Sequence, residues 1–217
     1  MRYPEIRRQI VDMCLRLEDL RFFLGTWGNV SVRQGEHILL TPSKVCYQTM
    51  TPEDIVIIDL DGNRVEGERN PTSEKEVHRQ IYLAREDVGA VIHAHTPYAM
   101  AASAGKICEV PCLVEEMSQL LGGGIPVTET YVPAEQHARL GEIAAKTMGA
   151  HNGVILRNHG PVAAGRNLED ALLACQVVEK ACQIYAAARV EPLLPIPEQA
   201  VQSEHYRYFT TYGHENT

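Results

Sequence analysis

The amino-acid sequence predicts a single domain of the α/β class. Its 217 residues are enough for one domain that buries a core without help from disulfide bonds. Stretches with apolar side chains at helical intervals alternate with short runs of β-branched residues, so helices and strands share the chain. Hydrophobic residues make up 45% and charged residues 22% of the composition, which is ordinary for a globular protein.

A helix followed by a meander of strands is predicted for the first part of the chain. Between Glu5 and Phe23, apolar side chains recur at helical spacing, namely Ile6, Ile10, Met13, Leu17 and Leu20. The segment Gly25 to Asn29 breaks this pattern. Three short strands are then expected, at Val30 to Val32, Ile38 to Leu40 and Ile55 to Leu60, with an Asp61-Gly62 turn after the last.

The second part of the chain is predicted to alternate helices and strands. A helix is expected to begin near Ser73 with a hydroxyl cap, since Val77 and Ile81 follow at helical spacing. A strand should end at His93-Ala94-His95. Beyond it we expect a helix over 97–104, a loop at 122–124, a helix over 135–148, a strand over 153–156 and a helix over 168–189.

A change of composition after Val190 predicts a tail. Pro192, Pro195 and Pro197 argue against a regular helix, so residues 191–217 are expected to be extended and residues 1–190 to form the folded domain. Four aromatic residues make this tail too apolar to stay fully solvated: Tyr206, Tyr208, Phe209 and Tyr212. We expect the tail to pack against protein, with a neighbouring subunit as one candidate.

Charge and cysteine content argue against several classes of protein. A net charge of −8 and a pI near 5.6 disfavour a nucleic-acid surface, because phosphate binding needs clustered basic residues. The six cysteines form no Cys-x-x-Cys pair and no secreted-type pattern, so we expect them to be reduced and the protein to be cytoplasmic. The charged N-terminus does not fit a secretory signal, and no apolar window is long enough to span a membrane.

Two histidines at the end of a predicted buried strand indicate a metal site. The strand Val88 to Ile92 is apolar, and alternation along a strand turns His93 and His95 to the same face. A second apolar strand, which begins at Val154, is followed closely by His159. Three imidazoles suit Zn²⁺, which favours nitrogen ligands. The remaining six histidines show no paired spacing and are expected on the surface or around the site: His37, His78, His137, His151, His205 and His214.

Glu74 is the carboxylate whose sequence context stands out. It follows Pro71-Thr72-Ser73 at a predicted helix start, where backbone N–H groups and two hydroxyl groups can hold an anion. If the Gly25 to Asn29 loop folds against this helix start, glycine backbone and the polar atoms of Asn29, Thr72 and Ser73 form a phosphate cradle. Alone, the glycine-containing loop is a weak signal that an ordinary turn explains better.

Five short motifs occur in an order that resembles one known family. They are Gly28-Asn29-Val30-Ser31-Val32, Thr41-Pro42-Ser43, Pro71-Thr72-Ser73-Glu74, His93-Ala94-His95 and Asn158-His159-Gly160. Together they resemble the class II aldolases, a family that includes L-fuculose-1-phosphate aldolase, L-ribulose-5-phosphate 4-epimerase and the adducin head domain. Each motif is weak by itself, but the resemblance extends over roughly residues 5 to 190.

The resemblance implies a role for each matching residue. Zinc-binding histidines match His93, His95 and His159, and Glu74 matches a carboxylate that both approaches the metal and exchanges the substrate proton. Phosphate-binding positions match Gly28, Asn29, Ser43, Lys44, Thr72 and Ser73. Tyr212 resembles a mobile C-terminal tyrosine that acts as an acid.

The resemblance also implies an architecture and a cofactor. It implies a three-layer α/β/α fold with a mainly antiparallel central sheet, and a homotetramer with active sites between subunits. Residues 1–190 would be the catalytic domain and residues 191–217 a tail that contributes to the active site. Each subunit would bind one Zn²⁺, although another divalent transition metal also fits.

Two positions depart from the fuculose branch of the family. Ser43-Lys44 stands where that branch has Thr-Gly, which adds a cation that could contact phosphate or another anionic group of the substrate. Glu115, four residues after Pro111, stands where that branch has a second active-site tyrosine. The aldehyde and the stereochemistry therefore stay open.

The function implied by the resemblance is that of a zinc-dependent aldolase. It would reversibly cleave a ketose 1-phosphate, of the L-fuculose or 5-deoxypentulose type, into dihydroxyacetone phosphate and an aldehyde. A pentulose-phosphate 4-epimerase is the nearest rival, but that branch has aspartate in place of Glu74. The family also includes a methylthioribulose-phosphate dehydratase and a decarboxylase of a phosphorylated sugar acid, which Lys44 would suit. An adducin-like structural module would be expected to have lost its metal ligands.

Overall fold

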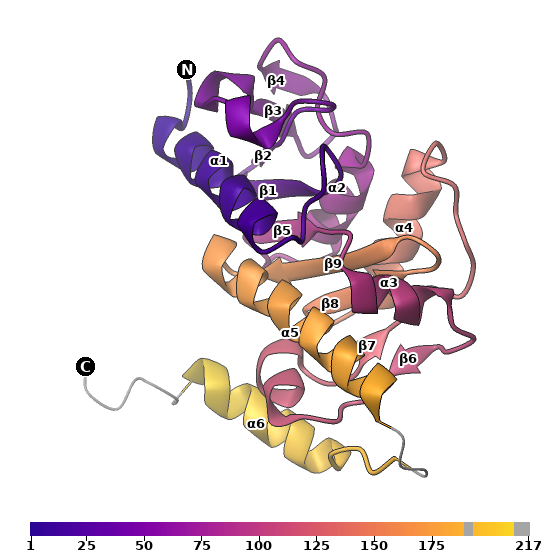
Figure 1. The fold of residues 1–217 in the computed structure, drawn as a ribbon. Coiled ribbons are helices and arrows are strands. Elements are labelled where there is room, and N and C mark those ends of the chain that lie inside the picture. The colour runs from indigo at the N-terminus through magenta and orange to yellow at the C-terminus, as the bar shows by residue number, and fades with distance from the viewer. Residues whose placement is uncertain (189–192, 211–217) are drawn as a thin grey trace.

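A seven-stranded sheet forms the middle layer of the molecule in the computed structural model, which describes residues 1–188 and 193–210 (Figure 1). The strand order is β4-β3-β2-β1-β5-β9-β8, and every neighbouring pair is antiparallel. The strands are β1 (Asn29–Gln34), β2 (His37–Leu40), β3 (Val56–Asp59), β4 (Arg64–Glu66), β5 (Ala90–His93), β8 (Gly153–Leu156) and β9 (Gly160–Gly165). A separate hairpin-like pair consists of β6 (Glu109–Val110) and β7 (Ile125–Pro126).

Helices cover both faces of this sheet. On one face, α1 (Pro4–Asp19) and α5 (Leu168–Ala187) enclose a core with the sheet, and α3 (Pro97–Ala104) packs against α5. On the other face, α2 (Lys75–Ala84) and α4 (His137–Met148) enclose a second core. Short helical turns are η1 (Tyr47–Thr49), η2 (Pro52–Asp54) and the π-helical η3 (Met117–Leu121). No helix in the described ranges has both the length and the apolarity to cross a bilayer.

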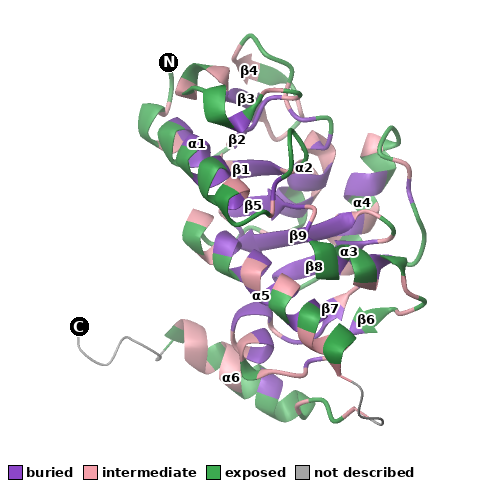
Figure 2. Ribbon diagram, viewed as in Figure 1, coloured by how far each residue is buried: buried purple, intermediate pink, exposed green. Residues whose placement is uncertain are grey.

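The three-layer α/β/α prediction with a mainly antiparallel sheet is confirmed. Strands between two helical layers lose solvent on both sides, which explains why β5 and β8 are buried at every residue (Figure 2). The strands expected at 30–32, 38–40 and 153–156 and the helix expected at 97–104 are present. Strand β9, directly after His159, was not predicted from the sequence.

Several helix ends differ from the sequence prediction, among them the start of α4, which is His137 where residue 135 was expected. Helix α1 stops at Asp19, not at Phe23, because Arg21 adopts a left-handed φ of 59° and the Phe22 N–H bonds back to the Leu17 carbonyl. Helix α2 begins at Lys75 without a side-chain cap, so the hydroxyl cap expected near Ser73 was wrong.

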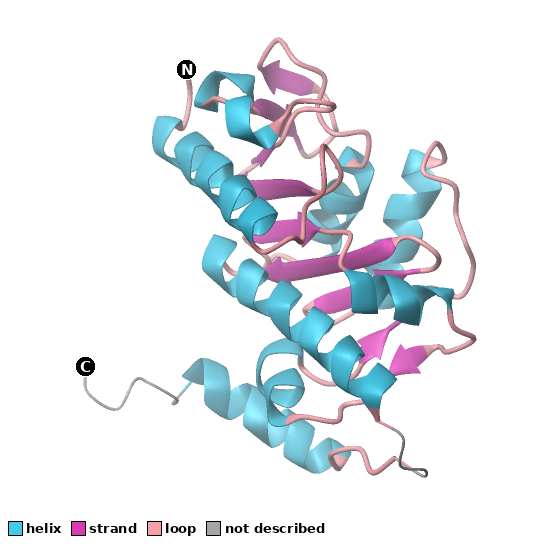
Figure 3. Ribbon diagram, viewed as in Figure 1, coloured by secondary structure: helices cyan, strands magenta, loops and turns pink. Residues whose placement is uncertain are grey.

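The prediction of a wholly extended C-terminal tail was also wrong. Residues Glu198–Thr210 form helix α6, which packs against η3 (Figure 3). The three prolines precede this helix, and the carbonyl of Pro197 accepts the Val201 N–H at 3.1 Å, so none of them interrupts its hydrogen bonds. The Phe209 ring packs on the guanidinium of Arg166, 4.5 Å from the ring centroid. Tyr212 lies outside the described residues.

Candidate metal centre

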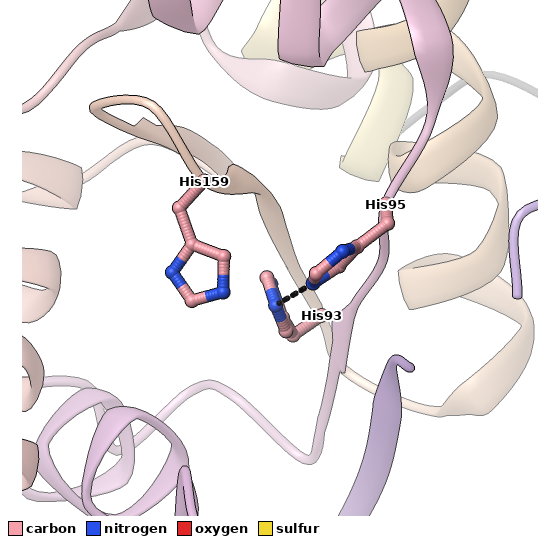
Figure 4. Close-up of side chains that lie close together, drawn as sticks. All are labelled: His93, His95 and His159. Carbon is pink, nitrogen blue, oxygen red and sulfur yellow. Dashed lines mark hydrogen bonds between the residues drawn. The ribbon is translucent and has the colours of Figure 1, made fainter. Parts of the chain in front are cut away.

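Three histidine side chains converge at one end of the central sheet. His93 is the last residue of β5, His95 follows two residues later, and His159 lies in the turn between β8 and β9. The Nε2 atoms of His93 and His95 are 3.1 Å apart, and one ring nitrogen from each of the three histidines lies within 4.8 Å of the others. Figure 4 shows the three rings gathered around one point. The structure brings together the three histidines that the sequence pattern indicated.

Strand pairing and one tight turn place these rings. Strand β5 lies between β1 and β9, with His93 opposite Asn29 on one side and Val162 on the other. The His159 N–H closes its turn by donating to the Leu156 carbonyl at 3.1 Å. Asn158 in this turn has a left-handed φ of 54°, which asparagine tolerates better than most residues. The sequence Asn-His-Gly therefore suits a sharp turn that presents an imidazole.

The donor chemistry of this cluster fits a divalent transition metal. His93 is fully buried, and its Nδ1–H donates to the Pro161 carbonyl at 2.9 Å, which leaves the Nε2 lone pair facing the cluster. Burial lowers the pKa of His93 to about 3, so this ring is a neutral nitrogen donor at physiological pH. Two nitrogen ligands of a tetrahedral Zn²⁺ lie about 3.3 Å apart, close to the 3.1 Å between His93 and His95.

The Glu74 carboxylate completes the cluster from the start of α2. Its Oε2 lies 3.2 Å from His93 Nε2, and its Oε1 lies 3.0 Å from His159 Nε2. Asn29 Nδ2 donates to Oε2 at 2.8 Å. Burial works to raise the pKa of this carboxyl group, but hydrogen bonds from the His159 ring and the Asn29 amide outweigh burial and hold the pKa well below its usual range. The group is an anion that can bind a metal or exchange a proton.

The three segments expected to bind phosphate lie next to one another. The Thr41 N–H donates to the Val30 carbonyl at 3.1 Å, and the Thr72 N–H donates to the Thr41 carbonyl at 2.9 Å. These bonds join the segments that carry Gly28-Asn29, Ser43-Lys44 and Thr72-Ser73. Ser73 and Lys44 are exposed, whereas Thr72 is buried and its Oγ1 accepts the Glu74 N–H at 3.3 Å.

Gly28 is required by the packing of its loop. Its φ is +104°, and a Cβ atom there would lie 2.3 Å from the Phe23 ring. Its carbonyl accepts a hydrogen bond from the Tyr47 hydroxyl at 2.7 Å. A side chain at this position would push the loop away from Asn29, the next residue, which holds Glu74. The loop that the sequence left open as an ordinary turn is therefore part of the site's framework.

Several neighbours of the cluster were not identified as part of the site from the sequence. His78 is fully buried between Ser31 and Asn29, and Ser31 also bonds the Tyr82 hydroxyl. The Trp27 indole stacks on the His95 ring with 6.3 Å between ring centroids. The signal for His78 and Tyr82 was their spacing of four and eight residues from Glu74, which puts all three on one helix face.

Acid is expected to destabilise the metal-free protein through His78. Burial lowers the pKa of His78 to about 4, whereas in the unfolded chain it is about 6.5. Between these values the unfolded chain takes up a proton that the folded state does not, so stability is complete above pH 6.5 and falls as pH falls toward 4. The loss from this group is at most about 3 kcal/mol.

Urea unfolding at pH 7 and pH 4.5 measures this effect. His78→Gln, which cannot be protonated in this range, is expected to lose less stability between the two pH values than the unaltered protein. Equal losses in both proteins would mean that other groups account for the acid sensitivity.

A family model and curated relatives match the chain over nearly its whole length. The model described as Class II Aldolase and Adducin N-terminal domain matches residues 8–186. The L-ribulose-5-phosphate 4-epimerase UlaF of Salmonella paratyphi B is 30% identical over 215 residues, which cover 93% of this chain and 93% of that protein. A second UlaF, from Salmonella paratyphi C, has the same identity and coverage.

Solved structures share the fold. An L-fuculose 1-phosphate aldolase superposes with a TM-score of 0.87 at 29% identity, covering 94% of this chain and 96% of that one. YgbL from Klebsiella pneumoniae, a protein described as a putative aldolase/epimerase/decarboxylase, superposes with a TM-score of 0.81 over 91% of this chain and 96% of its own. At 22% identity, YgbL supports the fold alone.

Proposed function

Because this chain belongs to the family of class II aldolase and adducin N-terminal domains, we propose that it is a zinc-dependent aldolase. In this proposal it reversibly cleaves a ketose 1-phosphate, of the L-fuculose or 5-deoxypentulose type, into dihydroxyacetone phosphate and an aldehyde. The observation that carries the proposal is the Glu74 carboxylate, which contacts two of the three converging imidazoles at 3.2 and 3.0 Å. An acid–base group beside a metal site is what carbon–carbon cleavage next to a carbonyl needs.

The metal is proposed to be Zn²⁺, held by His93, His95 and His159, with Glu74 as a further ligand before substrate binds. When bound, the ion would supply positive charge that stabilises negative charge developing on substrate oxygens. A structural module without activity would be expected to lack such ligands, and the donor set here is complete.

The three adjacent loops are proposed to hold the phosphate group. The polar atoms would come from Gly28 and Asn29, Ser43 and Lys44, and Thr72 and Ser73, in segments that backbone hydrogen bonds join to one another. Asn29 and Thr72 among them bond to Glu74. Fixing the phosphate end of the substrate converts binding energy into orientation of the reacting carbons.

Two protein groups are proposed to move protons. As the C3–C4 bond breaks, the C4 hydroxyl group loses its proton and C4 becomes the aldehyde carbon, while the electron pair stays with C3. In the condensation direction, we assign removal of the C3 proton to the Glu74 carboxylate and donation of a proton to the aldehyde oxygen to the Tyr212 phenol. Cleavage is the reverse: the Tyr212 phenolate takes the C4 hydroxyl proton and protonated Glu74 returns a proton to C3. A homotetramer in the cytoplasm, in which the C-terminal segment of one subunit reaches the site of another, is part of the same proposal and rests on the family resemblance.

A substrate panel tests the proposed function. Ketose 1-phosphates are incubated with zinc-loaded protein, and dihydroxyacetone phosphate is detected by a coupled reduction, with metal content measured on the same sample. Release of dihydroxyacetone phosphate from at least one sugar is expected. No release from any sugar by protein that holds one Zn²⁺ per chain would contradict the aldolase proposal.

A second candidate function is epimerisation of a pentulose 5-phosphate. It is favoured by the curated relatives at 30% identity, which are named L-ribulose-5-phosphate 4-epimerases. Inversion at C4 of L-ribulose 5-phosphate without release of a three-carbon product would support this candidate over the aldolase.

Replacing Lys44 by glycine is expected to weaken substrate binding without destabilising the fold. Lys44 is exposed beside the proposed phosphate site and has a left-handed φ of 59°, a conformation that glycine adopts freely. Loss of one charged hydrogen bond should raise KM roughly 10-fold, with little change in kcat. The thermal midpoint should stay the same or rise.

Arg21→Gly is the matched control for Lys44→Gly. Arg21 is also exposed and also has a φ of 59°, but it lies at the end of α1. Arg21→Gly is expected to remove the strain of a left-handed φ in the same way as Lys44→Gly, but to leave KM unchanged. An unchanged KM in Lys44→Gly would remove Lys44 from the binding site.

A further inference from the structure

Two periodicities bring five polar side chains into one buried row. Asn29 and Ser31 are two residues apart on β1 and therefore share a face of the strand. Glu74, His78 and Tyr82 are four residues apart, at the start of α2 and along it, and therefore share a face of the helix. All five are at most 7% exposed. Strand β1 and helix α2 thus contact each other through polar groups on the α2 side of the sheet.

Hydrogen bonds connect the whole row. The Tyr82 hydroxyl lies 2.8 Å from Ser31 Oγ, and Ser31 Oγ lies 2.7 Å from His78 Nδ1. His78 Nε2 bonds Asn29 Oδ1, and Asn29 Nδ2 bonds Glu74 Oε2 at 2.8 Å. The row ends on the carboxylate that faces the histidine cluster.

Chemistry fixes the direction of every bond in this row. A carboxylate only accepts, so the Asn29 amide nitrogen must face Glu74 and its oxygen must face His78. The His78 ring therefore donates from Nε2 and, being neutral, accepts at Nδ1 from the Ser31 hydroxyl. Ser31 Oγ in turn accepts from Tyr82, a fully buried phenol that burial keeps protonated by raising its pKa. Each donor points toward Glu74.

We propose that His78, held by Ser31 and Tyr82, is a positioning residue that fixes the Asn29 amide with its N–H toward Glu74. Without the His78 donor, the Asn29 oxygen is left unpaired in a buried site and the amide is held only by its bond to Glu74, so the side chain can turn away from the carboxylate to find another donor. When the Asn29 amide is oriented in this way, it keeps its hydrogen bond to Glu74 Oε2, and Glu74 Oε1 faces His159. The inference uses the metal role of the cluster from the proposed function, but it does not depend on which sugar is cleaved.

Two substitutions of His78 separate positioning from packing. His78→Gln places an amide N–H near the former Nε2 and preserves the donor to Asn29. His78→Asn is shorter, so its amide can meet Ser31 near the former Nδ1 but offers no donor to Asn29. Both remove the ring, and both should lower the thermal midpoint to a similar extent.

Three measurements are made on these variants. In crystal structures of the metal-free proteins, His78→Gln should keep the contact between Asn29 Nδ2 and Glu74, and His78→Asn should lose it. Zn²⁺ affinity, from competition with a chromogenic chelator, should fall about 10- to 100-fold in His78→Asn and stay within about threefold in His78→Gln. With a substrate that the unaltered protein cleaves, kcat should fall in His78→Asn and stay nearly unchanged in His78→Gln. KM should change less than kcat in both variants.

A pair of serine variants keeps the inference testable if His78→Asn does not fold. Ser31→Ala removes the donor that holds His78, whereas Ser118→Ala removes an equally buried hydroxyl that donates to the Glu115 carbonyl. Ser31→Ala should weaken Zn²⁺ binding and Ser118→Ala should not. The inference is overturned if His78→Gln and His78→Asn behave alike, or if Ser31→Ala matches Ser118→Ala. Unaltered protein that binds no Zn²⁺ would instead refute the proposed metal centre, while the crystal contact would still decide the positioning role.

Discussion

Replacing Glu74 by glutamine is expected to lower kcat for aldol cleavage by about two to four orders of magnitude, the usual contribution of a positioned acid or base. Glutamine has nearly the same shape and can still accept the Asn29 amide N–H, so folding should be retained. It cannot carry a proton to the substrate carbon. Zn²⁺ affinity should fall at least as far as in His78→Asn, because a charged ligand is lost, so kcat is compared at saturating Zn²⁺, where three imidazoles still hold the ion.

Proton exchange isolates this step from the rest of the reaction. Dihydroxyacetone phosphate incubated in deuterated water with the unaltered protein should take up deuterium at C3 of the future sugar, and Glu74→Gln should not support this exchange. Glu76→Gln is the control, since Glu76 lies on the same helix but pairs with Arg79. Exchange at an undiminished rate in Glu74→Gln would show that another group carries the proton.

The histidine cluster could be predicted from the sequence because short-range rules suffice for most of it. Alternation along a strand places His93 and His95 on one side, and a polar turn after an apolar strand presents His159. The pairing of β5 with β9, which brings His159 to His93 and His95, is a long-range contact that no local pattern contains. The family resemblance supplied that part.

The contacts within the buried polar row could not be predicted, although the spacing of its residues is visible in the sequence. Asn29 and Ser31 alternate on a strand, and His78 and Tyr82 continue the helix face of Glu74. Which strand face meets which helix face depends on the packing of α2 over the sheet. His78 therefore looked like any histidine on a helix.

The error in the C-terminal segment has a different physical origin. The three prolines predict no helix over the whole segment, but proline prevents helix only at interior positions. Helix α6 begins after Pro197, and Val201 is buried where the helix packs. Its contact with η3 is a tertiary interaction that composition does not reveal.

Removing one of the three imidazoles is also expected to have a large effect, in this case on Zn²⁺ affinity. His159→Ala should weaken Zn²⁺ binding by more than about 100-fold, because the loss of a partner outside the ligand set already costs 10- to 100-fold. Cleavage activity should fall with metal occupancy and recover partly at high Zn²⁺ concentration. Competition with a chelator gives the affinity. His37→Ala, which removes a histidine bonded to Tyr3 at the opposite end of β1 from Asn29 and His93, controls for the loss of an imidazole.

His159 is a better choice for this test than His93 because the two differ in burial. His93 is completely buried and bonded to Pro161, so its removal would leave a cavity and an unpaired carbonyl, and any loss of metal could follow from misfolding. The His159 side chain is 14% exposed and sits in a turn closed by backbone atoms, which alanine retains. Weak Zn²⁺ binding in a His159→Ala variant with an unchanged thermal midpoint therefore assigns the effect to the lost ligand. Affinity equal to that of the unaltered protein would mean that the ion binds elsewhere, and the role assigned to Glu74 would fall with the metal centre.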